Sequence, residues 1–400
     1  MQSFITAHAT HPDAHMALAL AAAQIDAQRA ERQPPFAATL GLIYLTDRLA
    51  PKADALLAEL QQRWPGVHWV GNVGVGVLAG SVEYFDEPAL ALMLCDLPAA
   101  SFQVFNGRQP IQSGFAHSAL VHADPGTHDL EELIAELAGR TSSGYLFGGV
   151  AASRSRQLHI ADGVFEGGLS GVAFAPAAQG TALRLVSRVT QGCQPLGPVR
   201  RITASERNLV LELDDQPALP LLLAELGVTL DQPQTALAAL RSTLVGLTEG
   251  GDTMLSRGGQ FGADTRVRHL IGIDPARQGI AIADQAEAGQ QLAFCRRDVA
   301  AARRDLVRIC AEIRDEVEVE TPVTAGAGAP GAPAPSRIAG AIYVSCSGRG
   351  GPHFGAPSAE AQIVAHALGE VAVIGFFAGG EIAHHHLYGY TGVLTVFVAD

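Results

Sequence analysis

A short motif of two apolar residues followed by glycine recurs four times along the chain. It occurs as Trp69-Val70-Gly71, Leu146-Phe147-Gly148, Leu270-Ile271-Gly272 and Val373-Ile374-Gly375. A segment with helical spacing precedes each motif, at 51–64, 128–139, 235–246 and 357–369, and another apolar run follows, at 88–95, 168–175, 291–295 and 391–398. This order predicts four related units of strand and helix, and therefore an internal duplication. The alternative is coincidence, because glycines end strands in many α/β chains.

The apolar runs also indicate the fold class. Those at 37–45 and 337–346 do not alternate with polar residues, which is typical of strands covered on both faces. We therefore predict an α/β fold with mixed sheets, built as two related lobes of sheet covered by helices. Each lobe is expected to carry two of the four repeats, with the join near residue 220. A chain of 400 residues, 48% of them hydrophobic, is long enough for two cores.

Charge and cysteine content exclude several classes of protein. The formal net charge of −13 and the lack of a Lys/Arg-rich run argue against a nucleic-acid surface. The apolar runs are too short for a membrane span, and the first residues lack the pattern of a secretory signal. The five cysteines are odd in number and far apart, so neither a disulfide framework nor a zinc finger is indicated. We expect a soluble cytoplasmic protein.

Two glycine-rich stretches near the C-terminus form the predicted ligand site. The first follows the apolar run 337–346, the second lies within and after 371–378, and a segment with helical spacing separates them. Glycines allow close approach to backbone N–H groups, and the start of a helix favours an anionic or polar ligand. The predicted ligand-binding residues are Cys346, Gly348, Arg349, Gly350, Gly351, Gly375, Gly379, Gly380 and Glu381.

The charged members of this site suggest how a ligand would be held. In a right-handed crossover the two strands are parallel, so both loops should face one cleft. Arg349 would bind a carboxylate and Glu381 an amine, as an amino-acid-like ligand requires. The alternative is that Arg349 and Glu381 pair with each other and only lock the turn. Because the loop is expected to lie outside the core, Gly350→Val should abolish binding and leave the fold intact.

Other candidate sites are weaker. Cys346 would be a nucleophile if its position before the loop lowered its pKa, but a buried thiol that packs as an apolar group is the favoured alternative. His384 and His386 would share one face of a strand and offer two metal ligands, although a surface cluster is favoured. We therefore assign no catalytic residue and no metal site.

Three further histidines lie near the N-terminus, at His8, His11 and His15. They offer an axial ligand for a haem group, although a solvated or capping role is favoured. A Cys-x-x-Cys-His motif is absent from the sequence, which excludes covalently attached haem. The cofactor therefore stays unassigned, with haem as an alternative.

Several segments resemble the two domains of the FIST (F-box and intracellular signal transduction) family. Segments 69–76 and 83–89 resemble the FIST N-terminal domain, and 192–198 with 208–214 resemble the region where it ends. Segments 271–275, 289–298, 345–351 and 375–382 resemble the FIST C-terminal domain. The resemblance implies an N-terminal helix and arm at 1–35, a FIST N-terminal domain at 36–218 and a FIST C-terminal domain at 219–397. Residues 321–335, rich in proline, glycine and alanine, are expected to form an inserted flexible linker.

The same resemblance implies a function. It points to a cytoplasmic small-ligand-binding sensory module of a signalling pathway, with an amino acid or similar metabolite as ligand. The module would act through a partner protein such as a kinase or cyclase, and not through nucleic acid or a membrane span. One alternative is a haem-binding nitric oxide sensor of the FIST type, and another is a cysteine-dependent enzyme that uses Cys346. We expect no enzyme activity.

Overall fold

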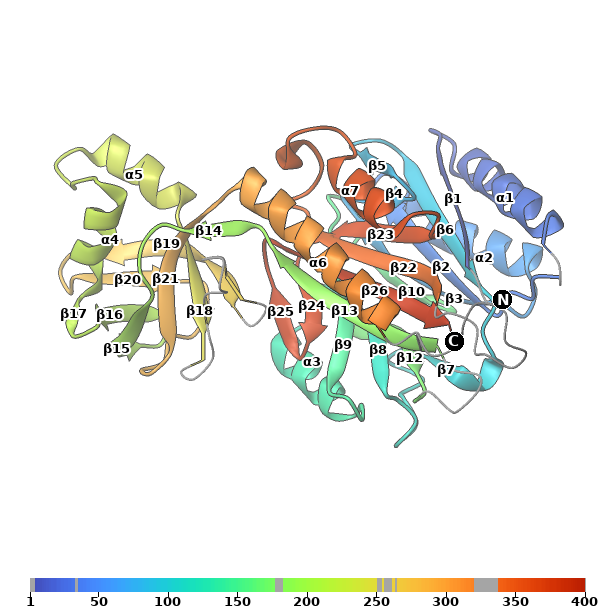
Figure 1. Ribbon diagram of the computed structural model, residues 1–400, viewed down its shortest axis with the longest axis horizontal. Coiled ribbons are helices and arrows are strands. Elements are labelled where there is room, and N and C mark those ends of the chain that lie inside the picture. Colours follow the sequence, from blue (N-terminus) through green and yellow to red (C-terminus); the bar gives the residue numbers. More distant parts are fainter. Residues whose placement is uncertain are drawn as a thin grey trace. The chain divides into compact units, whose positions relative to one another are not determined.

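The computed structural model describes residues 4–32, 35–176, 183–249, 254, 261–262, 265–319 and 337–399. The predicted linker at 321–335 lies outside the described residues. The chain divides into two compact units. Unit 1 comprises Met1–Thr190, Leu306–Leu387 and Thr391–Asp400, and unit 2 comprises Gln191–Asp305 and Tyr388–Tyr390. Both contain helices and strands, so the prediction of a mixed α/β fold is confirmed (Figure 1).

Unit 1 is built from three repeats of the same order of elements: an edge strand, a strand–helix–strand segment, a hairpin and a closing strand. The first repeat contains β1 (Ile5–Thr10), α1 (Ala14–Ala30), β2 (Leu40–Thr46), α2 (Ala53–Arg63), β3 (His68–Gly74), β4 (Gly76–Ala79), β5 (Val82–Phe85) and β6 (Ala89–Cys95). The second contains β7 (Phe102–Phe105), β8 (Ser118–Ala123), α3 (Leu130–Gly139), β9 (Tyr145–Val150), β10 (His159–Ala161), β11 (Val164–Phe165) and β12 (Leu169–Phe174).

The third repeat is interrupted by unit 2. It begins with β13 (Leu183–Gln191) and resumes along α6 (Val299–Val319). It then contains β22 (Arg337–Cys346), α7 (Ala359–Leu368), β23 (Val373–Ala378), β24 (Glu381–His384), β25 (His386–Tyr388) and β26 (Thr391–Ala399). Unit 2 is therefore an insertion between the edge strand and the strand–helix–strand segment of this repeat.

Each repeat supplies four adjacent strands of one six-stranded sheet, beginning with its own edge strand. The first sheet has the order β1-β6-β2-β3-β10-β11, the second β7-β12-β8-β9-β24-β25, and the third β13-β26-β22-β23-β4-β5. In each sheet the strands on either side of the helix are parallel, and the closing strand is antiparallel to the first of them. Strand pairs of this kind need a crossover connection, and α2, α3 and α7 provide it.

The hairpins are exchanged between the repeats in a cycle. The β4–β5 hairpin of the first repeat extends the sheet of the third, by pairing with β23. The β10–β11 hairpin of the second repeat pairs with β3 of the first. The β24–β25 hairpin of the third pairs with β9 of the second. Every sheet of unit 1 is thus completed by strands from another repeat.

The recurring glycine occupies the same position in all three repeats. Gly71, Gly148 and Gly375 lie in the second parallel strand, opposite Ile43, Val121 and Tyr343 respectively. A Cβ atom on these glycines would lie only 1.9, 2.0 and 1.8 Å from the carbonyl oxygens of those partners. Because a side chain cannot fit there, glycine is required by the close approach of two strands. The predicted equivalence of Gly71 and Gly375 is confirmed.

The fourth motif is different. Gly272 lies in β19 (Arg266–Asp274), whose neighbours are antiparallel, and a Cβ atom there would be 3.8 Å from the nearest side chain. The expectation of two repeats in each lobe was therefore wrong. Unit 1 carries three equivalent copies, whereas the motif in unit 2 lies in an antiparallel strand where glycine is not required for close approach. A glycine after two apolar residues marks both situations, so the sequence pattern could not separate them.

Aromatic and polar side chains from all three sheets meet inside unit 1. The Tyr44 ring lies 4.8 Å from that of Phe376, and the Tyr44 hydroxyl lies 3.2 Å from Nε2 of His122. All three residues are fully buried, and burial lowers the pKa of His122 to about 3. Helices α1 and α2 bury their apolar faces against the first sheet, and α3 covers the second (Figure 1).

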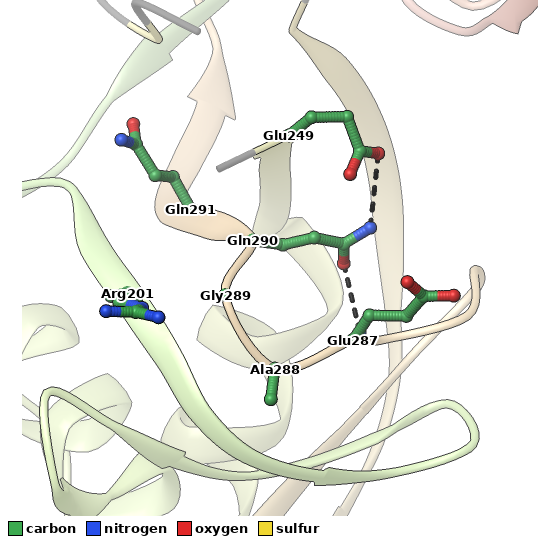
Figure 2. Close-up of a pocket in the computed structure, with 7 residues that line it drawn as sticks. All are labelled: Arg201, Glu249, Glu287, Ala288, Gly289, Gln290 and Gln291. Carbon is green, nitrogen blue, oxygen red and sulfur yellow. Dashed lines mark hydrogen bonds between the residues drawn. The ribbon is translucent and has the colours of Figure 1, made fainter. Parts of the chain in front are cut away.

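Unit 2 is a small barrel with two helices. Its strands are β14 (Cys193–Pro195), β15 (Arg200–Glu206), β16 (Leu209–Leu213), β17 (Gln216–Pro217), β18 (Leu244–Thr248), β19, β20 (Gly279–Ile282) and β21 (Gln291–Arg297). The order β21-β15-β16-β20-β19-β18 closes because β18 also pairs with β21. Helices α4 (Ala218–Leu226) and α5 (Pro233–Ser242) complete the unit. A cavity of about 500 Å³ lies where β15, β18 and β21 begin or end (Figure 2).

Among the described residues, we find no helix that is long and apolar enough to cross a membrane.

Candidate functional site

The two predicted loops do start at the same edge of the third sheet. Strands β22 and β23 are parallel, and Cys346 is opposite Ala378 in their register. The N–H group of Ser347 donates to the carbonyl oxygen of Ala378 at 2.9 Å, which holds the starts of the two loops together. The glycine-rich turn at 348–351 and the pair Gly379–Gly380 therefore follow neighbouring strand ends, as the right-handed crossover predicts.

One predicted loop residue lies elsewhere. Gly375 is in the middle of β23, paired with Tyr343, so it belongs to the sheet and not to the loop. The strand continues through it because the missing side chain makes room for the neighbouring strand, as described above. The prediction that a loop starts at Gly375 was therefore wrong, whereas Gly379 and Gly380 do lie in the loop after β23.

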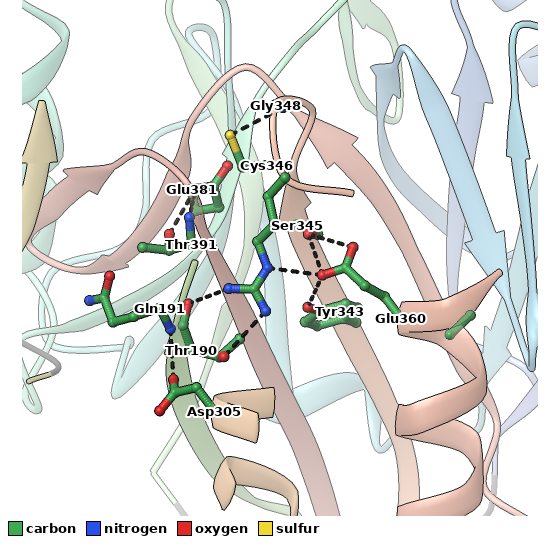
Figure 3. Close-up of polar contacts among 12 residues, drawn as sticks. Thr190, Gln191, Asp305, Tyr343, Ser345, Cys346, Gly348, Glu360, Glu381 and Thr391 are labelled. Carbon is green, nitrogen blue, oxygen red and sulfur yellow. Dashed lines mark hydrogen bonds and ion pairs between the residues drawn. The ribbon is translucent and has the colours of Figure 1, made fainter. Parts of the chain in front are cut away.

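Arg349 is buried and engaged, with a residue exposure of 5%. Its Nε donates to Glu360 at 2.9 Å, and its two terminal nitrogens donate to the carbonyl and hydroxyl oxygens of Thr190 at 2.9 and 3.2 Å (Figure 3). These bonds differ from the predicted contact with a ligand and also from the alternative, a pair with Glu381. Arg349 instead ties the turn to the start of α7 and to β13.

Glu360 is the centre of this network, although it was not predicted. It is fully buried in the first turn of α7 and accepts hydrogen bonds from Tyr343, Ser345 and Arg349. A carboxylate that is paired with a guanidinium and saturated with donors can be buried at acceptable cost. The sequence shows Glu360 shortly after the turn that contains Arg349, but nothing in it indicated that the Glu360 side chain is buried against the sheet.

Glu83 is a second buried carboxylate that was not predicted. It lies on β5, and its Oε1 accepts the backbone N–H of Ala361 at 2.8 Å. This contact takes the role of an N-cap for α7, because the residue at the cap position, Ser358, makes no such bond. Burial raises the pKa of Glu83 to about 7, with a smaller rise from the nearby charge of Glu360.

Glu381 is fully buried at the start of β24. Its Oε2 accepts hydrogen bonds from the hydroxyl and the backbone N–H of Thr391, at 2.7 and 3.2 Å. Its Oε1 is also buried and has no hydrogen-bond partner of normal geometry among the described residues. Burial raises the pKa of Glu381 to about 8, and smaller effects of Thr391, Arg349 and Cys346 act in the opposite direction.

Cys346 lies between these groups. It is buried, and its Sγ accepts the N–H of Gly348 at 3.4 Å. The glycines that follow pack tightly: a Cβ atom on Gly350 would lie 2.0 Å from the Phe377 ring, and one on Gly351 would lie 2.5 Å from the Phe85 ring. The expectation that Gly350→Val would leave the fold intact was therefore wrong, because this turn belongs to the core.

The histidine candidates do not assemble into one site. His384 has a φ of +53° and ends β24, so a turn separates it from His386 and the two do not share a strand face. The described part of the chain contains no group of three His, Cys, Asp or Glu residues arranged to hold a metal ion. His8 contacts the hydroxyl of Tyr84, and His15 contacts Glu59.

The fold and the sequence define the class of this protein and its family. The class is that of α/β proteins with three interleaved repeats and an inserted barrel, carrying buried carboxylates at one sheet edge. The FIST N domain matches residues 39–216 and the FIST C domain matches residues 218–384. The chain belongs to the FIST family. The boundary between the two matched domains falls inside unit 2.

The chain is similar to curated relatives over nearly its whole length. An uncharacterized protein of Mycobacterium tuberculosis is 31% identical over 419 residues, covering 97% of this chain and 98% of the relative. An uncharacterized protein of Mycobacterium bovis is 31% identical over 409 residues, covering 98% and 97% respectively. FIST domains are signalling and sensory domains, so a general role in signalling follows from the family.

Proposed function

We propose that this chain is a small-ligand sensor that acts through a partner protein, and that Glu381 binds the amino group of the ligand. The observation that carries the proposal is the buried Oε1 of Glu381, which has no hydrogen-bond partner of normal geometry among the described residues. Burial favours the neutral form of this carboxyl group, and a bound ammonium group would lower its pKa and stabilise the carboxylate with a charge-assisted hydrogen bond. The ligand class is an amino acid or a similar amine-bearing metabolite.

The other predicted residues support Glu381 in this proposal. Arg349 holds the turn in place through its hydrogen bonds to Glu360 and Thr190, and Glu381 is the residue that contacts the ligand. Gly379 and Gly380 lie directly before β24 and lack side chains that would block a ligand, and the buried thiol of Cys346 lies at the end of β22. Catalysis by Cys346 is not part of the proposal. The signalling partner is a separate chain such as a kinase or a cyclase.

A thermal-shift screen tests the proposal, because a ligand that binds the folded state raises the melting temperature. The panel contains the free amino acids, simple amines and haemin. The amine that stabilises the wild type should lose about 1.5–3 kcal/mol of binding free energy in Glu381→Gln, the range for a hydrogen bond to a charged group. Glu370→Gln, at an exposed glutamate, is the matched control and should bind as the wild type does.

Two outcomes would count against it. Equal affinity of the wild type and Glu381→Gln for the stabilising ligand would place the binding site elsewhere. Stabilisation by haemin alone, with a Soret band that shifts under nitric oxide, would replace the amine sensor with a gas sensor.

A further inference from the structure

The cavity in unit 2 shares no residue with the site around Glu381. It has a volume of about 500 Å³ and is lined by Arg201, Glu249, Glu287, Ala288, Gly289, Gln290 and Gln291. This volume lies within the range of roughly 300–1,000 Å³ that is typical of ligand pockets. The lining is rich in charged and amide side chains, so a polar ligand fits it better than an apolar one.

The register of the barrel explains why these side chains meet. Gln291 is directly opposite both Arg201 on β15 and Thr248 on β18. The next residue, Leu292, points into the barrel core. Because side chains alternate along a strand, Arg201 and Gln291 share the outer face, where the three strands begin or end.

A short turn holds the floor of the cavity in place. The side chain of Gln290 is nine-tenths buried and bridges two points: its Oε1 accepts the N–H of Glu287 at 3.1 Å, and its Nε2 donates to Glu249 at 3.3 Å (Figure 2). Gly289 has a φ of +104°, and its N–H donates to Ile202 on β15 at 2.8 Å. The turn is thus fixed both by its own side chain and by the neighbouring strand.

Two opposite charges on the rim have no partner within the described residues. The side chains of Arg201 and Glu287 make neither a hydrogen bond nor an ion pair there. Neighbouring arginines behave differently: Arg200 pairs with Glu225, and Arg266 pairs with Glu249 at 3.0 Å. Figure 2 shows Arg201 on one side of the turn and Glu287 on the other.

We propose that this cavity is a second ligand site, which binds a short zwitterionic peptide. Arg201 binds the terminal carboxylate through its planar guanidinium, and Glu287 binds the terminal ammonium group. The amide side chain of Gln291, which lies between strand ends at the same face, donates to and accepts from the peptide group. The proposal does not depend on ligand binding at Glu381.

Isothermal titration calorimetry on the full chain tests the proposal. The probes are L-alanyl-L-alanine, glycyl-L-glutamine and L-lysyl-L-glutamate, each compared with its N-acetylated and C-amidated form. We expect saturable binding of at least one free dipeptide and at least a tenfold loss of affinity when either terminus is blocked. Arg201→Gln should lose the preference for the free carboxylate, and Glu287→Gln the preference for the free ammonium group.

Matched controls lie in the same unit. Arg296→Gln changes an exposed arginine on the opposite face of β21, and Glu212→Gln changes an exposed glutamate on β16, so both should bind like the wild type. Glu381→Gln should also leave dipeptide binding unchanged, which separates this site from the one in unit 1. The proposal is overturned if none of the dipeptides binds, or if Arg201→Gln and Glu287→Gln retain wild-type affinity and selectivity.

Discussion

Buried charges dominate unit 1 at the scale of single residues. Glu83, Glu360 and Glu381 are withdrawn from water near one sheet edge, together with the single cation Arg349 among the residues of that network. Glu360 is compensated by Arg349, whereas the pKa values of Glu83 and Glu381 are raised by burial to about 7 and about 8. The folded state therefore favours the neutral form of two of these carboxyl groups.

This makes stability depend on pH in a direction that can be tested at Glu83. Its pKa is raised above the ordinary value of 4.5. The stability that the protonated form adds to the folded state is therefore fully present below about pH 4.5 and is lost as the pH rises to about 7. A shift of this size corresponds to about 3 kcal/mol. Glu83→Gln keeps an acceptor for the N–H of Ala361 but cannot ionise. Its free energy of unfolding relative to that of the wild type should therefore rise by about that amount between pH 4.5 and 7.5.

The measurement is urea unfolding followed by tryptophan fluorescence. Both tryptophans of the chain, Trp64 and Trp69, lie in unit 1, so the signal reports on the unit that contains Glu83. Parallel pH profiles for the wild type and Glu83→Gln would show that this carboxyl group does not titrate in the window.

The pair formed by Arg349 and Glu360 gives a second prediction. Arg349→Met removes the cation and leaves a fully buried carboxylate uncompensated, which should lower the free energy of unfolding by about 3–5 kcal/mol. Adding Glu360→Gln removes the stranded charge and should restore a large part of the loss. The same fluorescence experiment measures both variants. If the double variant is no more stable than Arg349→Met, electrostatic compensation is not the main role of this pair.

The sequence predicts part of this arrangement for a physical reason. Cys346 and the loop after β23 could be placed at one edge because a short crossover makes two strands parallel. The contacts of Arg349 with Thr190 and of Glu83 with Ala361 could not be predicted, since 159 and 278 residues separate the partners. The first contact spans the insertion of unit 2 and the second depends on the exchange of the β4–β5 hairpin, and neither leaves a local signal in the sequence.

At the scale of elements, the close approach of the parallel strands sets the tolerance for substitution. Gly375→Ala would place a methyl group 1.8 Å from the carbonyl oxygen of Tyr343, and Gly71→Ala and Gly148→Ala would do the same in their sheets. Each should destabilise unit 1 by more than about 4 kcal/mol, the exceptional range for one substitution. Gly272→Ala has free space and should change stability by less than about 1 kcal/mol.

Thermal melts followed by circular dichroism compare the four variants. Normal melting of Gly375→Ala would show that the two strands can move apart at little cost, which would contradict the requirement for glycine at this position. The regular spacing of the motif was sufficient to predict related repeats. It was not sufficient to predict their number, since an antiparallel strand of the barrel also carries the pattern of two apolar residues followed by glycine.

At the scale of the whole molecule, Gln191–Asp305, which form most of unit 2, are inserted at one point of unit 1, and Tyr388–Tyr390 join unit 2 from a second part of the chain. The carboxylate of Asp305 accepts the backbone N–H of Gln191 at 2.7 Å, so the first and last residues of the insertion lie side by side (Figure 3). Insertions with adjacent ends are removed more easily than those with distant ends. Replacing 191–305 by a Gly/Ser linker of about six residues should therefore leave unit 1 folded, with a tryptophan-monitored melt close to that of the wild type.

The control for this deletion is a chain with Gly375→Ala in the same background, which should lose the transition. Aggregation of the deletion variant itself would show that unit 1 needs the barrel in order to fold.

The cyclic exchange of hairpins also constrains how the chain is made. The first repeat leaves the ribosome with its hairpin unable to pair, because β23 is synthesised almost 290 residues after β5. The edge of β9 likewise stays open until β24 is made, and open edges invite pairing with other chains. A nascent or truncated chain that ends before β23 is consequently exposed to aggregation, and the synthesis of β23 and β24 provides the missing strand partners.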